Sequence, residues 1–178
     1  MQMTANQNNQ FSETELDSIE QVYNKNIELD FSTEYYHNLI AINDKQYQLI
    51  NTAGTDDFMD MFKNLNFFSW KGIKLSAYKA AQRIHTHVDL YPDIPVIVTG
   101  HSMGGAVAIA YKRMFDADYC VAFAPARCLR YWAKRKMEDT TIFTDPDDCV
   151  SELLFGLGFG LPDCEEIEAS ENHNLYSI

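Results

Sequence analysis

The segment from Gly100 to Gly104 holds residue types that can do nucleophilic chemistry, in an order that restricts their geometry. It reads Gly-His-Ser-Met-Gly and lies between the apolar runs "PVIVT" and "GAVAIA". A Gly-x-Ser-x-Gly turn between a strand and a helix is typical of the sharp turn, the nucleophile elbow, that presents a serine hydroxyl above a sheet. Ser102 is therefore the candidate nucleophile. Met103, the residue after it, is the candidate donor of a backbone N–H to an oxyanion.

A serine hydroxyl needs a base to accept its proton, and this base is usually a histidine held by a carboxylate. In the α/β-hydrolases the acid and then the histidine follow the serine along the chain. The chain contains five histidines, at positions 37, 85, 87, 101 and 173. Only His173 lies downstream of Ser102, so His173 is the candidate base. His101 is adjacent to Ser102, but we expect its side chain to point away from that of the serine.

The candidate acids lie in "TIFTDPDDCV", which begins as an apolar strand and breaks at Pro146. A carboxylate just beyond the carboxyl end of a strand lies at the edge of the sheet where active sites form. Asp145, Asp147 and Asp148 all satisfy this position. Three neighbouring acids are also typical of a solvated loop, and their positions alone do not choose among them.

A second N–H donor for the oxyanion is expected from a loop that follows an earlier strand. The segment "NTAGTDD" fits this description, because Gly54 ends a predicted strand and Thr55 precedes a predicted helix. The N-terminus of that helix would favour negative charge. Thr55 is the candidate donor, and the alternative is that Gly54 and Thr55 form an ordinary turn from strand to helix.

Apolar runs around these residues predict the strands that position them. Three short runs without alternation are expected of parallel strands buried on both faces; they span 94–99, 119–124 and 140–144. The segment 35–55 predicts two further strands joined by a hairpin-like turn at Asn43, Asp44 and Lys45.

Helical patterns alternate with these strands. Ser12 is the predicted N-cap of a first helix that runs to about Asn26, with Glu15 completing a capping box and Phe11 and Leu16 a hydrophobic staple. Apolar periodicity predicts further helices over 56–65 and from 76 toward Pro92, and the segment 103–115 is apolar on all sides in its first half, so it must be enclosed. The order of elements predicts a doubly wound α/β fold with a mostly parallel central sheet.

Length and composition predict one domain over 11–178 after a disordered tail over 1–10. The formal net charge of −12 argues against nucleic acid as a partner. The basic run 127–136 is an exception, and it is read either as a solvated helix face or as a docking site for an anionic partner. No apolar run reaches membrane length, and the N-terminus lacks the pattern of a signal peptide, which favours the cytoplasm. Transient contact with a membrane surface stays open.

No metal site or cofactor is expected from the sequence. The four cysteines, at positions 120, 128, 149 and 164, have no Cys-x-x-Cys pair and read as free thiols. His85 and His87 are two residues apart on a predicted helix, so they do not share a face and do not form a metal pair.

Together these residues resemble the class 3 lipases, a fungal-type family of α/β-hydrolases, from about Tyr36 to Tyr176. The family's elbow reads Gly-His-Ser-Leu-Gly-Gly-Ala, and "GHSMGGA" differs from it only by Met103. Its oxyanion loop reads Phe-Arg-Gly-Ser/Thr, which "TAGT" matches, and "AFAPAR" resembles its segment after the next strand. Its acid lies in an Asp-x-Val-Pro segment matched by "DCVS", and a histidine precedes a Tyr-containing segment matched by "HNLY".

The resemblance implies an α/β-hydrolase fold with little or no cap domain, and a Ser102, Asp148 and His173 triad with the Thr55 and Met103 amides as the oxyanion hole. It implies hydrolysis of carboxylic esters, with lipid or acyl esters as substrates and no cofactor. The chain departs from the family pattern at Ala53, where the family has Arg, at Ser151, where it has Pro, and in the segment "LSAY". The alternatives are a non-catalytic interaction module on the same fold, and an amidase or thioesterase with the same triad.

Two apolar segments are candidates for an acyl pocket. One spans 153–162, lies between the candidate acid and histidine, and alternates glycine with apolar residues as a mobile flap would. The other spans 58–70. Ordinary core packing is the alternative for both.

Overall fold

The computed structural model describes residues 11–27, 35–52, 70–126, 136–144 and 161–168. The predicted tail over 1–10, the predicted helix over 56–65, most of the basic run 127–136 and most of the flap 153–162 lie outside these ranges. Leu161 and Pro162, at the end of the flap segment, are described and buried.

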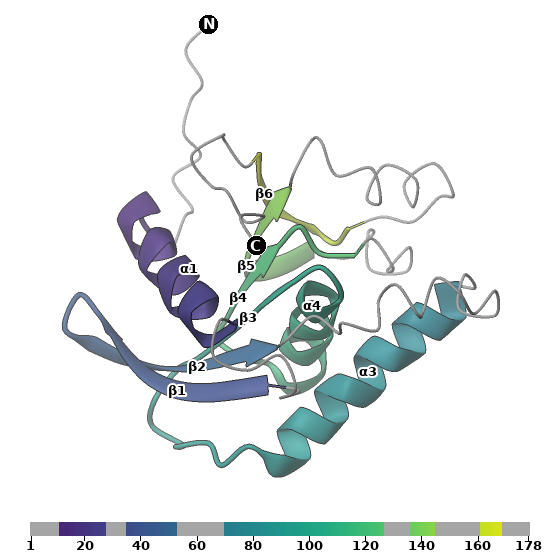
Figure 1. Ribbon diagram of the computed structural model, residues 1–178, viewed down its shortest axis with the longest axis horizontal. Helices are drawn as coiled ribbons and strands as arrows, with labels where there is room; N and C mark the ends of the chain where they lie inside the picture. Colours follow the sequence, from purple (N-terminus) through teal and green to yellow (C-terminus); the bar gives the residue numbers. More distant parts are fainter. Residues whose placement is uncertain (1–10, 28–34, 53–69, 127–135, 145–160, 169–178) are drawn as a thin grey trace, which may run out of the picture.

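One six-stranded sheet forms the centre of the molecule, in the strand order β1-β2-β3-β4-β5-β6 (Figure 1). Its strands are β1 (Tyr35–Ile42), β2 (Lys45–Thr52), β3 (Val96–His101), β4 (Tyr119–Phe123), β5 (Lys136–Thr144) and β6 (Asp163–Glu168). β1 pairs with β2 antiparallel, whereas each later strand is parallel to the one before it. The fold is therefore the mostly parallel α/β sheet that the sequence predicted.

The first two strands form the predicted hairpin. Its turn holds Asn43 and Asp44, with φ of 49° and 63°, and Ile42 pairs with Lys45. Positive φ at both central residues is the requirement of a two-residue type I′ turn, and Asn and Asp tolerate that conformation. Lys45 begins β2 and is not part of the turn, which corrects the predicted boundary by one residue.

The winding of the sheet differs from the doubly wound prediction. Strand order follows chain order without a reversal among the described strands. The helices α3 (Trp70–His87) and α4 (Met103–Phe115) lie together on one face, while α1 (Glu13–Ile27), which precedes all strands, lies on the other (Figure 1). α1, which precedes the sheet in the chain, thus covers the second face. Apolar periodicity predicts the helix itself but not the face of the sheet on which it packs.

Side-chain alternation along the strands divides the core into two clusters. On β2 and β3, Leu49 and Ile97 pack toward α1, whereas Ile50 and Val98 pack toward α3 and α4. The cluster on the α1 side also includes Phe11, Leu16, Ile19, Val121, Phe123 and Phe143. On the opposite side the enclosed helix α4 is buried at every position from 103 to 111, as its apolar first half predicted.

α1 begins at Glu13, directly after the predicted N-cap Ser12, and the Glu15 half of the predicted capping box is present. The Ser12 backbone N–H and its hydroxyl donate to the Glu15 carboxylate at 2.6 and 2.7 Å, and the Glu15 N–H donates to the Ser12 carbonyl. The amide of Asn43 donates to the other Glu15 carboxylate oxygen at 2.7 Å. These hydrogen bonds lower the pKa of Glu15, with the Ser12 N–H as the largest cause. The capping residues therefore also fix α1 to the hairpin turn.

β6 is an element that the sequence reading missed. Its sequence, Asp-Cys-Glu-Glu-Ile-Glu, is rich in residues that strands disfavour. Charged side chains are nevertheless common on strands at the edge of a sheet, where they oppose pairing with other chains. Ile167 packs on the α1 side and Cys164 on the α4 side, so the strand still has two apolar anchors.

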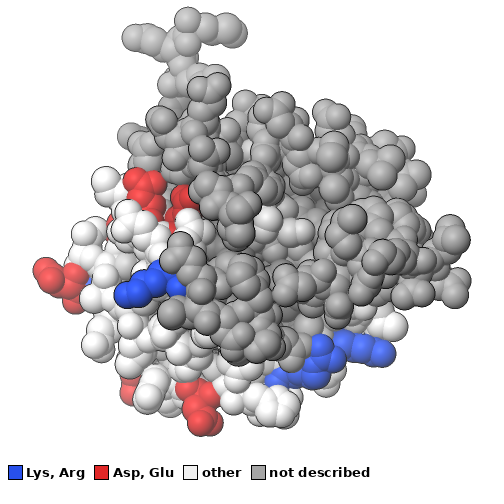
Figure 2. All heavy atoms as spheres, in the orientation of Figure 1, with Lys and Arg blue, Asp and Glu red and all other residues white. Residues whose placement is uncertain are grey.

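Figure 2 shows charged side chains of both signs on one face of the molecule. Lys and Arg side chains lie over α3, at the lower right, and a further basic group lies on the left, on the side of α1 and the hairpin, where acidic side chains are also present. Among the helices that the structure describes, none combines the length and apolar character that crossing a membrane requires.

Candidate active site

Ser102 occupies the turn between β3, which ends at His101, and α4, which begins at Met103. Its backbone has φ 51° and ψ −118°, in a region that favours glycine. A non-glycine residue in such a conformation costs about 1–3 kcal/mol and persists only where the surrounding structure enforces it. The predicted strand, turn and helix are thus present, and the serine holds the strained position at their junction.

Backbone hydrogen bonds hold Ser102 on both sides. Its N–H donates to the carbonyl of Phe123 on β4 at 3.1 Å. Its carbonyl accepts from Ala106 in α4 at 3.2 Å and from Ala126, after β4, at 2.9 Å. The Ser102 side chain makes no capping hydrogen bond to α4, although Ser102 stands at the N-cap. Capping therefore does not use the hydroxyl.

Glycines allow the strand and helix to approach each other closely. A Cβ on Gly100 would lie 2.5 Å from the backbone carbonyl of Gly104 and would also collide with the Thr52 hydroxyl. A Cβ on Gly105 would lie 2.8 Å from the Pro125 side chain. Gly100 therefore lets α4 lie against β3, and Gly105 lets it lie against the chain after β4.

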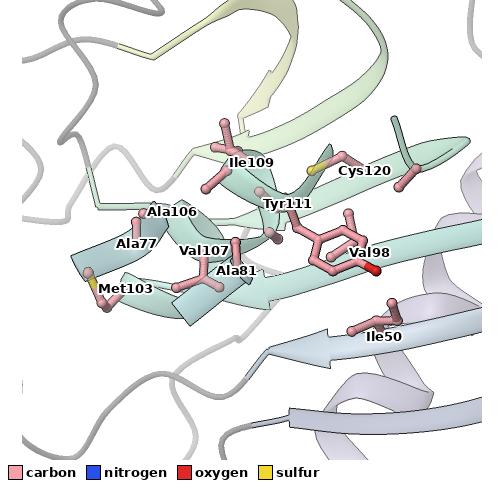
Figure 3. Close-up of a cluster of buried hydrophobic side chains, with 14 of the residues drawn as sticks. Ile50, Ala77, Ala81, Val98, Met103, Ala106, Val107, Ile109, Tyr111 and Cys120 are labelled. Atoms are coloured by element: carbon pink, nitrogen blue, oxygen red, sulfur yellow. The ribbon is translucent and has the colours of Figure 1, made fainter. Parts of the chain in front are cut away.

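Met103 is the first residue of α4. The first intrahelical hydrogen bond runs from Ala106 to Ser102, so the Met103 N–H has no acceptor within the helix. The helix dipole makes this end favourable for negative charge. The Met103 side chain is buried, and Figure 3 shows it in the cluster that includes Ala77 and Ala106. Its side chain belongs to the core, while its backbone is at the turn.

His101 ends β3, and His85 and His87 lie in the last turn of α3. By strand alternation His101 shares the face of Ile97, toward α1, and not the α4 side. His85 stacks on Phe115 at 3.8 Å between ring centroids and shares a hydrogen bond with the Tyr111 hydroxyl. The His87 ring instead contacts the carbonyl of Arg83 within its own helix. The prediction that His85 and His87 face different directions is confirmed.

Thr55, Asp148 and His173 lie outside the described residues, as do the alternative acids Asp145 and Asp147. The structure does describe the strand ends that precede them. Thr55 follows Thr52 at the end of β2, Asp148 follows Thr144 at the end of β5, and His173 follows Glu168 at the end of β6.

Burial raises the pKa of three side chains on the α4 side of the sheet. It raises the pKa of the Cys120 thiol well above its usual range, and that of Cys164 to about 12. It also raises the pKa of Tyr111 to about 12. Both cysteines are free thiols, and burial disfavours the thiolate form of each. Over the described ranges, no three His, Cys, Asp or Glu side chains are grouped so as to hold a metal ion.

A family model described as lipase (class 3) matches residues 29–156, which is more than half of the chain. The chain belongs to the class 3 lipase family. The resemblance read from the elbow is thereby confirmed, together with the α/β-hydrolase fold. Membership in the lipase family indicates an ester hydrolase in general terms, with lipid esters as the substrate class.

The lipase match includes Thr55, Ser102, Met103 and Asp148 and ends before His173. A comparison with curated protein sequences gave no significant match. The candidate role of His173 as the base therefore depends on its order along the chain, because the family match ends before this residue.

Proposed function

We propose that this member of the lipase family is a serine hydrolase that cleaves lipid or acyl esters through an acyl-enzyme. Ser102 is the nucleophile, His173 its base and Asp148 the acid. The Thr55 and Met103 amides stabilise the oxyanion. The observation that carries the proposal is the backbone of Ser102, held at positive φ between a parallel strand and a helix N-terminus with its hydroxyl outside the helix cap.

The direction of the strands supports this set of residues. β2 to β6 are parallel, so the carboxyl ends of β2, β3, β5 and β6 share one edge of the sheet. Neighbouring strands lie about 4.8 Å apart, which puts β5 roughly 10 Å and β6 roughly 14 Å from β3. Asp148 is four residues beyond β5 and His173 five beyond β6. An extended chain spans at most ~3.3–3.6 Å per residue, so both separations allow an approach to Ser102.

The proposed reaction has two halves. His173 accepts the Ser102 proton as the serine oxygen attacks the ester carbonyl carbon, and the oxyanion accepts hydrogen bonds from the Met103 and Thr55 N–H groups. The leaving alcohol takes the proton from His173. Water, deprotonated by the same histidine, then releases the acid from Ser102. Asp148 orients the imidazole and stabilises its protonated form.

The apolar character of the segments 58–70 and 153–162 supports acyl substrates. Leu161, at the end of the second segment, is buried in the cluster that includes Met103. The 153–162 segment therefore ends in the same cluster that receives the side chain next to Ser102. We place the acyl chain against these two segments.

Labelling with a fluorophosphonate probe tests the nucleophile. The wild-type protein should be labelled and Ser102→Ala should not, while circular dichroism shows both to be folded. Labelling that persists in Ser102→Ala, or a folded wild-type protein that is not labelled, contradicts the proposal. The second result favours a non-catalytic interaction module.

A substrate series tests the chemistry. Hydrolysis of p-nitrophenyl esters should extend to medium and long acyl chains and should vanish in Ser102→Ala. Activity restricted to the shortest chains counts against a lipid substrate. Faster turnover of matched amides or thioesters than of esters would make the protein an amidase or a thioesterase.

A further inference from the structure

Thr52 is the last residue of β2, and its side chain lies beneath the elbow on the α4 side of the sheet. It is 1% exposed. Its hydroxyl donates to the Gly104 carbonyl oxygen at 2.7 Å and has the Thr99 carbonyl oxygen as a second acceptor at 3.0 Å. These acceptors stand on either side of Ser102 in the chain: Thr99 is in the incoming strand and Gly104 in the outgoing helix.

The space for this hydroxyl exists because Gly100 has no side chain. Thr52 and Gly100 are partners in the parallel register of β2 and β3. A Cβ on Gly100 would collide with the Thr52 hydroxyl oxygen. The glycine of the elbow motif thus admits the threonine of the neighbouring strand.

The strained backbone of Ser102 needs such support. Its positive φ is stable only if the strand and helix are held in place on both sides. The hydrogen bonds to Phe123, Ala106 and Ala126 act on Ser102 itself. The Thr52 hydroxyl acts across the elbow, because one atom contacts the chain both before and after the turn.

We propose that Thr52 is a positioning residue that closes the elbow from the neighbouring strand and thereby fixes the Ser102 hydroxyl and the Met103 N–H. This inference rests on the proposed function and adds a residue outside its triad and oxyanion hole. Because Thr52 is buried, removing its hydroxyl should loosen the elbow without exposing a new group to substrate. A displacement of about 1 Å at a reacting group costs on the order of 100-fold in rate.

The test compares Thr52→Val, which has nearly the same shape without the hydroxyl, with Thr52→Ser, which keeps the hydroxyl. We expect Thr52→Val to lower kcat and the rate of fluorophosphonate labelling by about 10- to 100-fold with little change in KM. Thr52→Ser should stay within about threefold of wild type, a rescue that follows from retaining the hydrogen bonds. Thr52→Ala removes the hydroxyl without adding a methyl group near the carbonyls, and it should resemble Thr52→Val in rate.

Thr99→Val is the matched control. Thr99 is also buried, on the strand next to Thr52, but its hydroxyl has no hydrogen-bond partner among the described residues. It should therefore retain activity. Wild-type rates in Thr52→Val and Thr52→Ala, or equal losses in Thr52→Ser and Thr52→Val, would overturn the proposal.

Amide hydrogen exchange by NMR keeps this inference separate from the proposed function. The Ser102 and Ala106 amides should exchange faster in Thr52→Val and Thr52→Ala than in wild type, while amides of α1 stay unchanged. If the wild-type protein is not labelled by the probe, the proposed function fails. Exchange then still decides whether Thr52 closes the elbow, and unchanged protection of Ser102 and Ala106 would show that it does not.

Discussion

Thr52 on β2 and Gly100 on β3 are register partners, and the hydroxyl of Thr52 occupies the space into which a side chain at Gly100 would extend. The same hydroxyl contacts the backbone of α4 at Gly104. At the elbow β2, β3 and α4 therefore contact one another. The absence of a side chain at Gly100 leaves the space that the Thr52 side chain fills.

Gly100→Ala tests this contact. Its methyl group would meet both the Thr52 hydroxyl and the Gly104 backbone, neither of which is the end of a flexible side chain. We expect a loss of about 3 kcal/mol or more in the free energy of unfolding, at the upper end of overpacking effects. Gly105→Ala, which meets Pro125 at 2.8 Å, should lose less. Urea denaturation of the two variants gives the order, and a smaller loss for Gly100→Ala would contradict it.

Ser102→Gly should be more stable to unfolding than Ser102→Ala, and both variants should be inactive. Glycine relieves the strain of φ 51°, so we expect this variant to be about 1 kcal/mol more stable to unfolding than Ser102→Ala. Thermal and urea unfolding of the two inactive variants measure the difference. Asp116→Gly, at φ 53° beyond the far end of α4, is the control and should keep wild-type activity. Equal stability of Ser102→Gly and Ser102→Ala would show that the serine is not strained.

The acid can be identified by comparing three neutral variants. If Asp148 holds the histidine in its active tautomer, Asp148→Asn should lower kcat on the order of 10⁴-fold. Asp145→Asn and Asp147→Asn then serve as matched controls from the same segment and should stay near wild type. Ester hydrolysis rates measure all three, and a severe loss in either control with an active Asp148→Asn would move the acid to that residue.

The capping box of α1 predicts a dependence of stability on pH. The pKa of Glu15 is lowered in the folded protein, chiefly by the Ser12 N–H, so its ionised form stabilises the fold above the unfolded pKa. That contribution is lost as the pH falls through the folded pKa, below 4.5. Glu15→Gln should therefore be less stable than wild type at pH 7. We expect the loss in the free energy of unfolding to be no more than about 1 kcal/mol, because the carboxylate is solvated and its interactions are screened.

The difference between wild type and Glu15→Gln should shrink in urea denaturation at pH 3. Asp17→Asn removes a charge from the same helix and should show no such difference at pH 7. Equal stability of wild type and Glu15→Gln at pH 7 would mean that the hydrogen bonds of Glu15 contribute nothing to folding.

Sequence patterns that span only a few adjacent residues predict the local backbone structure correctly. Ser12 and Glu15 are three residues apart, Asn43 and Asp44 are neighbours, and the elbow spans Gly100 to Gly104. In each case the backbone conformation follows from side chains within one turn. The family resemblance rests on the same kind of local pattern, and its fold is confirmed.

The sequence by itself therefore determined where the chain turns, which residue stands at the elbow and which helix must be enclosed. Tertiary structure alone decided the uninterrupted order of the described strands, the acidic strand β6 at the edge of their sheet and the place of Thr52 beneath Ser102. The hydrogen bonds of Thr52 join it to residues 47 and 52 positions away in the chain. Contacts at such separations depend on which strands become neighbours, and burial of both faces of the sheet, not local preference, selects those neighbours.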